Sequence, residues 1–374
     1  MATLIEVLET QLNVDVDTMD PILTKSLPFI PHDMTSNQFV VNEQMQVPEN
    51  GGLLLGAVKE YGDLGWLAVL DRISALLCAE NIVNIHGRVL LQTSPFFAYD
   101  TQKVVEHARH YAIELEKVGI SKDRFCIKIP ATGPAMNACR ILREEGIRTL
   151  GTSLFSVPQA IAASQAGCLY ISPYFNAWNI DQRVVSEIAA HTDRSLWPAS
   201  DDPAVNHPIS HRLMQILETY KRLYRETGQE QPMLKPAAFI SVQEVMACGE
   251  MEMHQATIGP RLLAELSALP AVPSASTKIP GVPKVDMTKP YANARPTPTR
   301  LAHMSQTDPL NPEWGGKIAS TDIDYLANNG AELDREIEAD PATKKRVFDS
   351  LEIFKVGELS SKAIIEKAIQ ELKN

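Results

Sequence analysis

The chain has 374 residues, which is enough for one large α/β barrel or for two ordinary domains. Its net charge of −11 excludes nucleic-acid binding as an expected function, because a nucleic-acid interface needs a basic surface. No apolar run is long enough to span a membrane, and the first residues lack the basic and apolar regions of a secretory signal. We therefore expect a cytoplasmic protein without membrane contact. Its five scattered cysteines are expected to be reduced and buried and to bind no zinc: Cys78, Cys126, Cys139, Cys168 and Cys248.

Strand-like and helix-like segments alternate through most of the chain. In chain order, strands are predicted over Val14–Thr18, Arg88–Thr93, Arg124–Pro130, Arg148–Phe155, Cys168–Pro173 and Met233–Phe239. Helices are predicted over Gly52–Glu80, Thr101–Val118, Pro134–Glu145, Pro158–Ala166, Ile209–Thr227, Val242–Cys248 and Pro260–Ala268. Repeated strand-then-helix units imply parallel strands covered by helices, and about eight units in this length favour a closed (β/α)8 TIM barrel. No glycine-rich phosphate loop follows a strand, which argues against an open nucleotide-binding sheet.

The composition changes after Pro270, since nine prolines fall from Pro270 to Pro312 among few large apolar residues. We expect residues 1–270 to form the catalytic barrel, 271–320 an irregular connection, and 321–374 helices that pack on the barrel. Asp340-Pro341 predicts the start of one of these helices, and the last is predicted over Ser361–Leu372. The apolar stripe of that last helix must be buried against the barrel or a partner subunit: Ile364, Ile365, Ala368, Ile369 and Leu372.

Lys128 is unusual because it stands inside the apolar run 125–130, which is predicted to be a buried strand. Side chains alternate along a strand, so Lys128 faces the barrel interior if Ile127 and Ile129 face the helices. It also lies near the carboxyl end of its strand, where the active sites of barrels are found. Burial lowers the pKa of a lysine, and a partly neutral amine can form a Schiff base with a carbonyl.

The same alternation brings other polar side chains to the predicted barrel mouth. Asp17, Gln92 and Thr152 lie in strands whose apolar residues face outward, Tyr174 follows a strand, and Asn37 ends the segment 32–37. With Lys128 they supply an amine, a carboxylate, two amides and two hydroxyls around one cavity. This set suits Schiff-base carbon–carbon chemistry, which needs a nucleophile and a route for protons.

Each of these residues also has a purely structural interpretation. A single interior lysine is more often salt-bridged than nucleophilic, and Asp15 or Asp20 is an alternative to Asp17 as the interior carboxylate. Lys235 is the rival nucleophile, although the face of its strand on which it lies is less clear. Gln92, Thr152 and Tyr174 are individually ordinary core residues, and only their shared location favours a catalytic role.

The segments that carry these residues resemble the transaldolase family over nearly the whole predicted barrel. Residues 17–20 are similar to its first-strand aspartate motif, 33–37 to its D-x-T-T-N-P segment with Gln38 in place of proline, and 127–132 to its Schiff-base lysine motif. Residues 145–160 resemble the next unit, 171–174 the sixth strand, and 199–203 the insertion of full-length transaldolases. The resemblance implies a (β/α)8 barrel, a Schiff base at Lys128, no metal, no organic cofactor and frequent homodimers.

Gln92 departs from this pattern, because transaldolases have a glutamate at the corresponding position. A glutamine can orient a water molecule but cannot ionise to act as a general acid or base. The small fructose-6-phosphate aldolases of the superfamily are similar to this chain here, and the resemblance implies that Tyr174 acts with a water bound by Gln92. Leu150 replaces the asparagine that precedes the fifth-strand threonine of transaldolases.

The phosphate-binding residues of the family are also missing from their expected positions. An arginine is expected at Ala177, and a serine and an arginine at Ala238 and Ile240. Loss of these charge-assisted contacts is expected to weaken the binding of a phosphorylated sugar by about three orders of magnitude. Lys235 or Arg183 is left as an alternative cation for a phosphate.

Aromatic residues near the missing arginines indicate that a flatter and more apolar group takes the place of the phosphate. In the resulting site Lys128 attacks the carbonyl, Asp17 moves protons, and a water is held by Gln92, Thr152 and Tyr174. The predicted substrate-binding residues are Thr35, Asn37, Ser172, Asn176, Trp178 and Phe239.

We therefore expect a Schiff-base aldolase or transaldolase-like enzyme that makes or breaks a carbon–carbon bond of an unphosphorylated ketone or aldehyde. Such a substrate points to a specialised pathway instead of central carbohydrate metabolism. Two alternatives stay open. One is an ordinary transaldolase that moves a dihydroxyacetone unit between sugar phosphates in the pentose phosphate pathway. The other is a non-catalytic barrel that acts as a binding protein.

Overall fold

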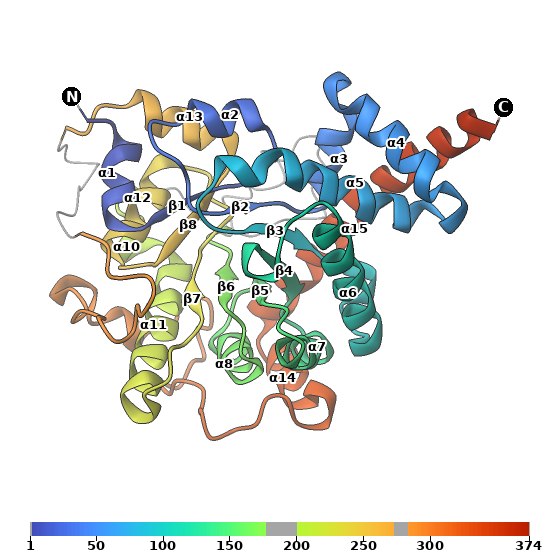
Figure 1. Cartoon of the computed structure of the whole chain (residues 1–374). Coiled ribbons are helices and arrows are strands. Elements are labelled where there is room, and N and C mark those ends of the chain that lie inside the picture. Colours follow the sequence, from blue (N-terminus) through green and yellow to red (C-terminus); the bar gives the residue numbers. More distant parts are fainter. Residues whose placement is uncertain (1, 177–199, 273–282, 374) are drawn as a thin grey trace.

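The computed structural model describes residues 2–176, 200–272 and 283–373, and Figure 1 shows their arrangement. Eight parallel strands form one sheet in the order β7-β6-β5-β4-β3-β2-β1-β8. The strands are β1 (Asn13–Val16), β2 (Met34–Thr35), β3 (Val89–Gln92), β4 (Phe125–Pro130), β5 (Thr149–Leu154), β6 (Tyr170–Pro173), β7 (Met233–Leu234) and β8 (Gln255–Ile258). The Thr257 amide donates to the Pro236 carbonyl at 3.0 Å and links the two ends of the sheet. The predicted (β/α)8 barrel is therefore confirmed.

Helices surround the strands, as repeated β/α units require (Figure 1). Those that follow the strands are α2 (Pro21–Ser26), α3 (Gln38–Gln46), α4 (Gly51–Tyr61), α5 (Trp66–Asn81), α6 (Thr101–Lys117), α7 (Gly133–Glu144), α8 (Val157–Ala166), α10 (Pro203–Asn206), α11 (Pro208–Thr227), α12 (Val242–Glu250) and α13 (Pro260–Ala268). A short helix, α1 (Leu4–Gln11), precedes β1. No helix in the described parts of the chain has the length and apolar character needed to cross a membrane.

The two faces of the strands bury different residues, which decides where polar side chains can point. Leu90, Cys126, Leu150 and Tyr170 form a small apolar layer inside the barrel. Neighbours of these residues in the same strands, such as Ile127, belong to the main core between the strands and the helices. The predicted alternation in β3 and β4 is therefore correct.

Two predicted elements differ from the structure, and two short strands were not predicted. The predicted helix Gly52–Glu80 is two helices, α4 and α5, because a 3-10 turn over Gly62–Leu64 and Gly65 with φ of +98° separate them. The predicted strand Met233–Phe239 ends at Leu234, because Pro236 has no N–H for a ladder and Ala238 has φ of +62°. The short strands β2 and β8 were not predicted, since neither has a long apolar or β-branched run.

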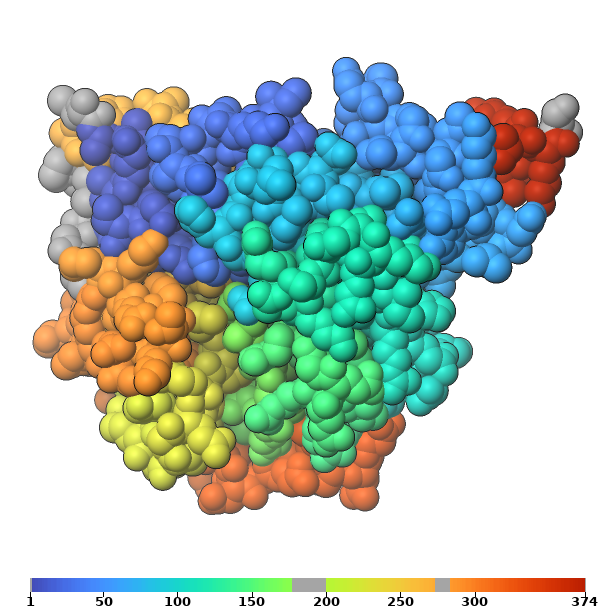
Figure 2. All heavy atoms as spheres, viewed as in Figure 1, coloured from blue at the N-terminus to red at the C-terminus, as the bar shows by residue number. Residues whose placement is uncertain are grey.

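Residues 283–326 are irregular except for two 3-10 turns, and the chain then forms α14 (Ala327–Ala339) and α15 (Pro341–Lys373). The prediction that the last helix begins at Ser361 is wrong, because α15 continues without a break from Pro341. Helix α15 packs on α3, α4 and α5. Its predicted stripe is only partly covered, with Ile365 buried and Leu372 43% exposed. Figure 2 shows α4 and the end of α15 projecting together from one side of the molecule.

Candidate active site

The predicted catalytic residues lie at the carboxyl ends of neighbouring strands. Lys128 is in β4 and Gln92 ends β3, and the two are register partners in the parallel ladder. Thr152 in β5 pairs in the same way with Pro130, two residues beyond Lys128. Asp17 directly follows β1, and its amide bonds to the carbonyl of Ile258 at the end of β8. The barrel thereby gathers residues that are far apart in the sequence at one end of the strands.

Lys128 is buried, with 6% of its surface exposed. Its Nζ donates to Thr35 Oγ1 at 3.0 Å and to the Ser36 carbonyl at 2.7 Å, so both partners are uncharged. Burial is the main cause that lowers the pKa of Lys128 to about 8, and the charge of Lys235 lowers it further, whereas Asp17 opposes the shift. A substantial fraction of this amine is therefore neutral near neutral pH.

Asp17 is the carboxylate that interacts with the Lys128 ammonium. Burial raises the pKa of Asp17, and the positive charge of Lys128 acts in the opposite direction. Its Oδ1 is buried and has no hydrogen-bond partner among the described residues. Asp20, an alternative in the sequence, instead caps α2 by accepting from the Ile22 amide at 2.8 Å. Asp17 is thus available to exchange a proton with a group bound near Lys128.

Lys235, the rival nucleophile, is held between two carboxylates. Its Nζ lies 2.5 Å from Asp33 Oδ2 and 3.1 Å from Asp15 Oδ2, and the side chain is fully buried. Burial acts to lower the pKa of Lys235, but the two carboxylates outweigh it, so that the pKa is raised. This lysine stays protonated and cannot attack a carbonyl.

The carboxylates around Lys235 also belong to a group with metal-ligand spacing. Asp15, His32 and Asp33 each offer one ligand atom, and these atoms lie within 4.8 Å of one another. The Lys235 ammonium already contacts both carboxylates, and His32 Nδ1 lies 3.0 Å from Asp33. These contacts balance the negative charges of the two carboxylates. The cluster therefore resembles a buried ion network that serves the structure of the barrel.

Thr152 and Tyr174 form a hydrogen-bonded pair, with 2.8 Å between the hydroxyl oxygens. Burial raises the pKa of Tyr174 to about 12, so its phenol stays protonated and can donate a hydrogen bond. Gln92 does not join this pair directly, because its Nε2 donates to Gln38 Oε1 at 2.8 Å. Its buried Oε1 has no partner among the described residues and is free to accept from a water.

Gln38 contacts the candidate site and was missed by the sequence analysis. It fixes the Gln92 amide and also donates from Nε2 to the Thr93 carbonyl at 3.1 Å. Glu358 of α15, itself bonded to Ser94 at 2.6 Å, is a further hydrogen-bond partner of Gln38. No local sequence signal connects these positions, and the only hint was that Gln38 replaces a proline of the family motif.

The predicted substrate-binding residues have several different environments. Thr35 accepts from Lys128, and Asn37 Oδ1 caps α3 by accepting from the Phe39 and Val40 amides, so only the Asn37 Nδ2 group remains for a substrate. Asn176 Nδ2 donates to Glu244 at 2.7 Å, which ties it into the wall. Ser172 is buried near the end of β6, and Phe239 packs on Phe175. Trp178 lies outside the described residues, as do Ala177 and Arg183.

A cavity of about 250 Å³ opens beside Asp17. Ala238, Phe239 and Ile240 form one wall of it, so the positions where the phosphate ligands were expected do line a cavity. Arg261 at the start of α13 also lines the cavity and was missed by the sequence analysis. Its guanidinium donates to the Ile240 carbonyl at 2.8 Å and to Glu265 at 2.6 Å.

The model of the family described as transaldolase/fructose-6-phosphate aldolase matches residues 14–297. The chain belongs to this family. A transaldolase of Nostoc punctiforme is 30% identical over 64% of this chain and 69% of its own length. A transaldolase of Prochlorococcus marinus is 29% identical over 78% of this chain and 80% of its own length. One of Methylococcus capsulatus is 30% identical over 64% of this chain and 70% of its own length. The protein is therefore an enzyme of the transaldolase and aldolase type, and a divergent one.

Proposed function

We propose that the protein makes or breaks a carbon–carbon bond of a ketone or aldehyde through an imine at Lys128. The contrast between the two buried lysines carries this proposal. Lys128 has neutral hydrogen-bond partners and a pKa of about 8, whereas carboxylates hold Lys235 in its charged form. Of the two, only Lys128 has the unprotonated amine that addition to a carbonyl requires.

The neutral Lys128 amine adds to the carbonyl carbon, and loss of the oxygen as water leaves a protonated imine. Asp17, whose pKa is raised by burial, supplies a proton to the leaving oxygen and takes one back in a later step. When a hydroxyl two carbons from the imine carbon is deprotonated, the bond between its carbon and the α-carbon breaks. The electron pair of that bond moves to the imine and gives an enamine and an aldehyde. Addition of the enamine to another aldehyde (transfer) or its protonation (cleavage) restores the imine. Hydrolysis of that imine then releases the carbonyl product and the free Lys128 amine.

The remaining polar residues are proposed to bind the substrate and one water. Gln92 Oε1 and the Tyr174 hydroxyl, which Thr152 orients, hold the water that carries the proton. The free Nδ2 of Asn37 donates to a substrate hydroxyl. The apolar wall of Ala238, Phe239 and Ile240 supports an unphosphorylated substrate, because a phosphate there lacks charged partners on that wall.

Borohydride trapping tests the chemistry. Reduction in the presence of dihydroxyacetone or another small ketone should add the mass of one donor minus one oxygen atom to a peptide that contains Lys128, because the imine loses water and gains two hydrogens. Lys128→Met should abolish the adduct. Lys235 is the internal control, because its peptide should stay unmodified in the same sample. A turnover-competent protein that gives no adduct at Lys128 contradicts the proposal.

Arg261 favours a second candidate, the ordinary transaldolase reaction between sugar phosphates. Its guanidinium and the first amides of α13 border the cavity beside Asp17, and Thr257 Oγ1 in the same wall has no partner among the described residues. This candidate predicts turnover of fructose 6-phosphate with erythrose 4-phosphate that falls at least about tenfold in Arg261→Gln. The first candidate predicts that unphosphorylated donors react faster and that Arg261→Gln leaves their rate unchanged.

A further inference from the structure

A second and larger cavity, of about 500 Å³, lies at the opposite end of the barrel from Lys128. Its walls come from residues at the amino ends of the strands: Arg88 precedes β3, Arg148 precedes β5, Tyr170 begins β6 and Gln255 begins β8. The apolar layer of Leu90, Cys126 and Leu150 lies inside the barrel between the two ends. This cavity is therefore separate from the candidate active site.

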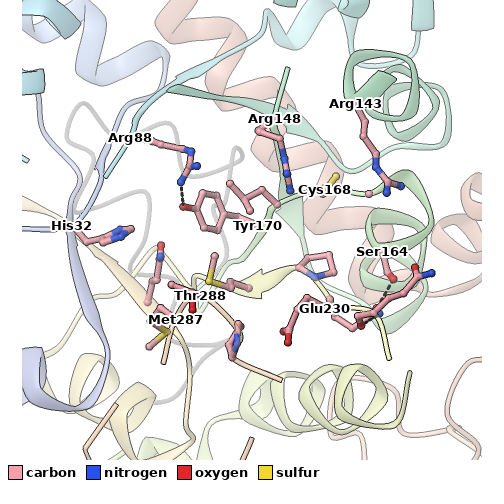
Figure 3. A pocket seen from close by; sticks show the side chains of 18 residues that line it. His32, Arg88, Arg143, Arg148, Ser164, Cys168, Tyr170, Glu230, Met287 and Thr288 are labelled. Atoms are coloured by element: carbon pink, nitrogen blue, oxygen red, sulfur yellow. Dashed lines mark hydrogen bonds between the residues drawn. The ribbon is translucent and has the colours of Figure 1, made fainter. Parts of the chain in front are cut away.

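The cavity is basic, although the whole chain is acidic. Arg88, Arg143 and Arg148 line it, and Figure 3 shows the three along one side with their guanidinium groups directed inward. Glu230 is the one carboxylate among the described lining residues. Its two oxygens already accept from the Tyr291 amide at 3.0 Å and the Ala292 amide at 3.2 Å. The cavity consequently has an excess of positive charge.

None of the three arginines forms an ion pair within the described parts of the chain, although the Asp33 carboxylate attracts Arg88. Arg88 donates from Nη1 to the uncharged Tyr170 hydroxyl at 3.2 Å, and its buried Nε has no hydrogen-bond partner among the described residues. Arg143 lies in the last turn of α7, where a cation is favourable by itself, so this residue alone indicates no ligand. Gly167, with φ of +72°, lets the Arg143 side chain lie against the backbone, since a Cβ there would be 2.4 Å from Arg143 Cδ.

Gln255 is the independent sign that something binds. Its side chain is fully buried and borders the cavity, yet neither Oε1 nor Nε2 has a hydrogen-bond partner among the described residues. An unpaired buried amide is costly, and such groups are rare unless a ligand or water satisfies them. Gln255 and the three arginines line the same cavity, so a ligand that fills it adjoins both.

We propose that this cavity binds the phosphate ester of a small, otherwise uncharged molecule, at a site distinct from the one that carries Lys128. The forked guanidinium groups suit phosphate oxygens. The volume is in the range of small-molecule sites and exceeds what a bare phosphate fills. Apart from Glu230 and His32, the rest of the lining is neutral and partly apolar, including Tyr170, Met233, Met287 and Thr288. It suits an uncharged body such as a sugar alcohol or a nucleoside.

Titration calorimetry with AMP and with glycerol 3-phosphate tests the proposal, since neither probe has a carbonyl that reacts with Lys128. At least one should bind with a stoichiometry of one, whereas adenosine and glycerol should not bind. The double variant Arg143→Gln/Arg148→Gln should weaken binding by about 100-fold. Arg140→Gln is the matched control, because Arg140 is exposed on the same helix outside the cavity, and it should leave the affinity unchanged.

Two further variants separate this site from the active site and from a folding defect. Lys128→Met should bind the probe as the unmodified protein does, whatever the outcome of the imine experiment. Gln255→Leu should leave the ligand-free melting temperature unchanged or raised, because it removes an unpaired amide, and should weaken binding by about tenfold. Three results overturn the proposal: no binding of either phosphate, unchanged affinity in the double arginine variant, or loss of binding in Lys128→Met.

Discussion

Lys128 and Lys235 are both buried in the barrel, but their pKa values shift in opposite directions because the oxygen atoms nearest to them differ in charge. The hydrogen-bond partners of Lys128, the Thr35 hydroxyl and the Ser36 carbonyl, are polar but uncharged. Burial away from water is therefore the main influence on its pKa. Lys235 lies against Asp15 and Asp33, and the attraction outweighs the desolvation. The sequence predicted a lowered pKa for Lys128, because strand alternation places it in the barrel interior. It could not predict the raised pKa of Lys235, because it left the face of that residue unclear and named the partners of neither lysine. The pairs that decide the outcome join positions far apart in the chain.

The pH dependence of imine formation should follow Lys128. Its lowered pKa of about 8 means that the neutral, reactive fraction grows as the pH rises through about 8 and is largely lost below it. The rate of borohydride-sensitive adduct formation with a ketone, measured under single-turnover conditions, should therefore rise through this range. A lysine with an ordinary pKa would place the rise near about pH 10 instead, which would contradict the assignment.

Stability should also distinguish the two lysines. Lys235→Met leaves Asp15 and Asp33 buried without their cation and should cost about 3–5 kcal/mol of unfolding free energy. Lys128→Met removes an amine with neutral partners and should change this free energy by no more than about 1 kcal/mol. Urea denaturation at neutral pH measures both. Equal losses would mean that Lys128 is as firmly ion-paired as Lys235.

At the scale of elements, strand and helix patterns predicted the barrel because each unit repeats a strong local signal. The alternation in β3 and β4 also predicted which side chains face inward. Patterns failed where structure depends on tertiary contacts. Strand β8 pairs with β1 over Gln255–Ile258 although its residues carry little apolar signal, and α15 is one helix because its long face packs on α3, α4 and α5.

Helix α15 reaches the active site through Glu358, which no sequence pattern indicated. Glu358→Ala removes the bonds to Ser94 and Gln38 and should cost about 1–3 kcal/mol of stability. Because Gln38 positions Gln92, we also expect kcat to fall about tenfold with little change in KM. Glu366→Ala on the exposed face of the same helix is the control. Loss of stability without loss of kcat in Glu358→Ala would mean that the connection to Gln92 has no role in turnover.

At the scale of the whole molecule, the homodimer that the family resemblance implies stays a prediction, as does the division of the chain at residues 270 and 320. Light scattering coupled to size-exclusion chromatography should give a mass twice that of one chain. A monomer at micromolar concentration would contradict the expectation. The incomplete burial of Leu372 at the end of α15 is compatible with either state, so the mass decides.

The closure of the barrel between β7 and β8 differs from its other strand contacts. Across it the described residues form one backbone–backbone hydrogen bond, from the Thr257 amide to the Pro236 carbonyl. A second bond runs from the Leu234 amide to Nδ1 of the His254 side chain. In hydrogen–deuterium exchange, we expect the Thr257 amide to exchange much faster than the Ile127 amide in the continuous ladder of β4. Equal protection of the two amides would show that the closure is as stable as the ladder.

The cavity beside Asp17 lies across this closure, with Ala238–Ile240 on one side and Thr257–Leu262 on the other. Its width therefore depends on the strand contact with few backbone hydrogen bonds, whereas Lys128 sits in continuously paired strands. If Lys128 forms the proposed imine, we expect slight opening of this closure to admit acceptors of different breadth while the geometry around the amine is preserved. Tolerance toward the substrate and rigidity of the proposed nucleophile would then belong to opposite parts of the same sheet.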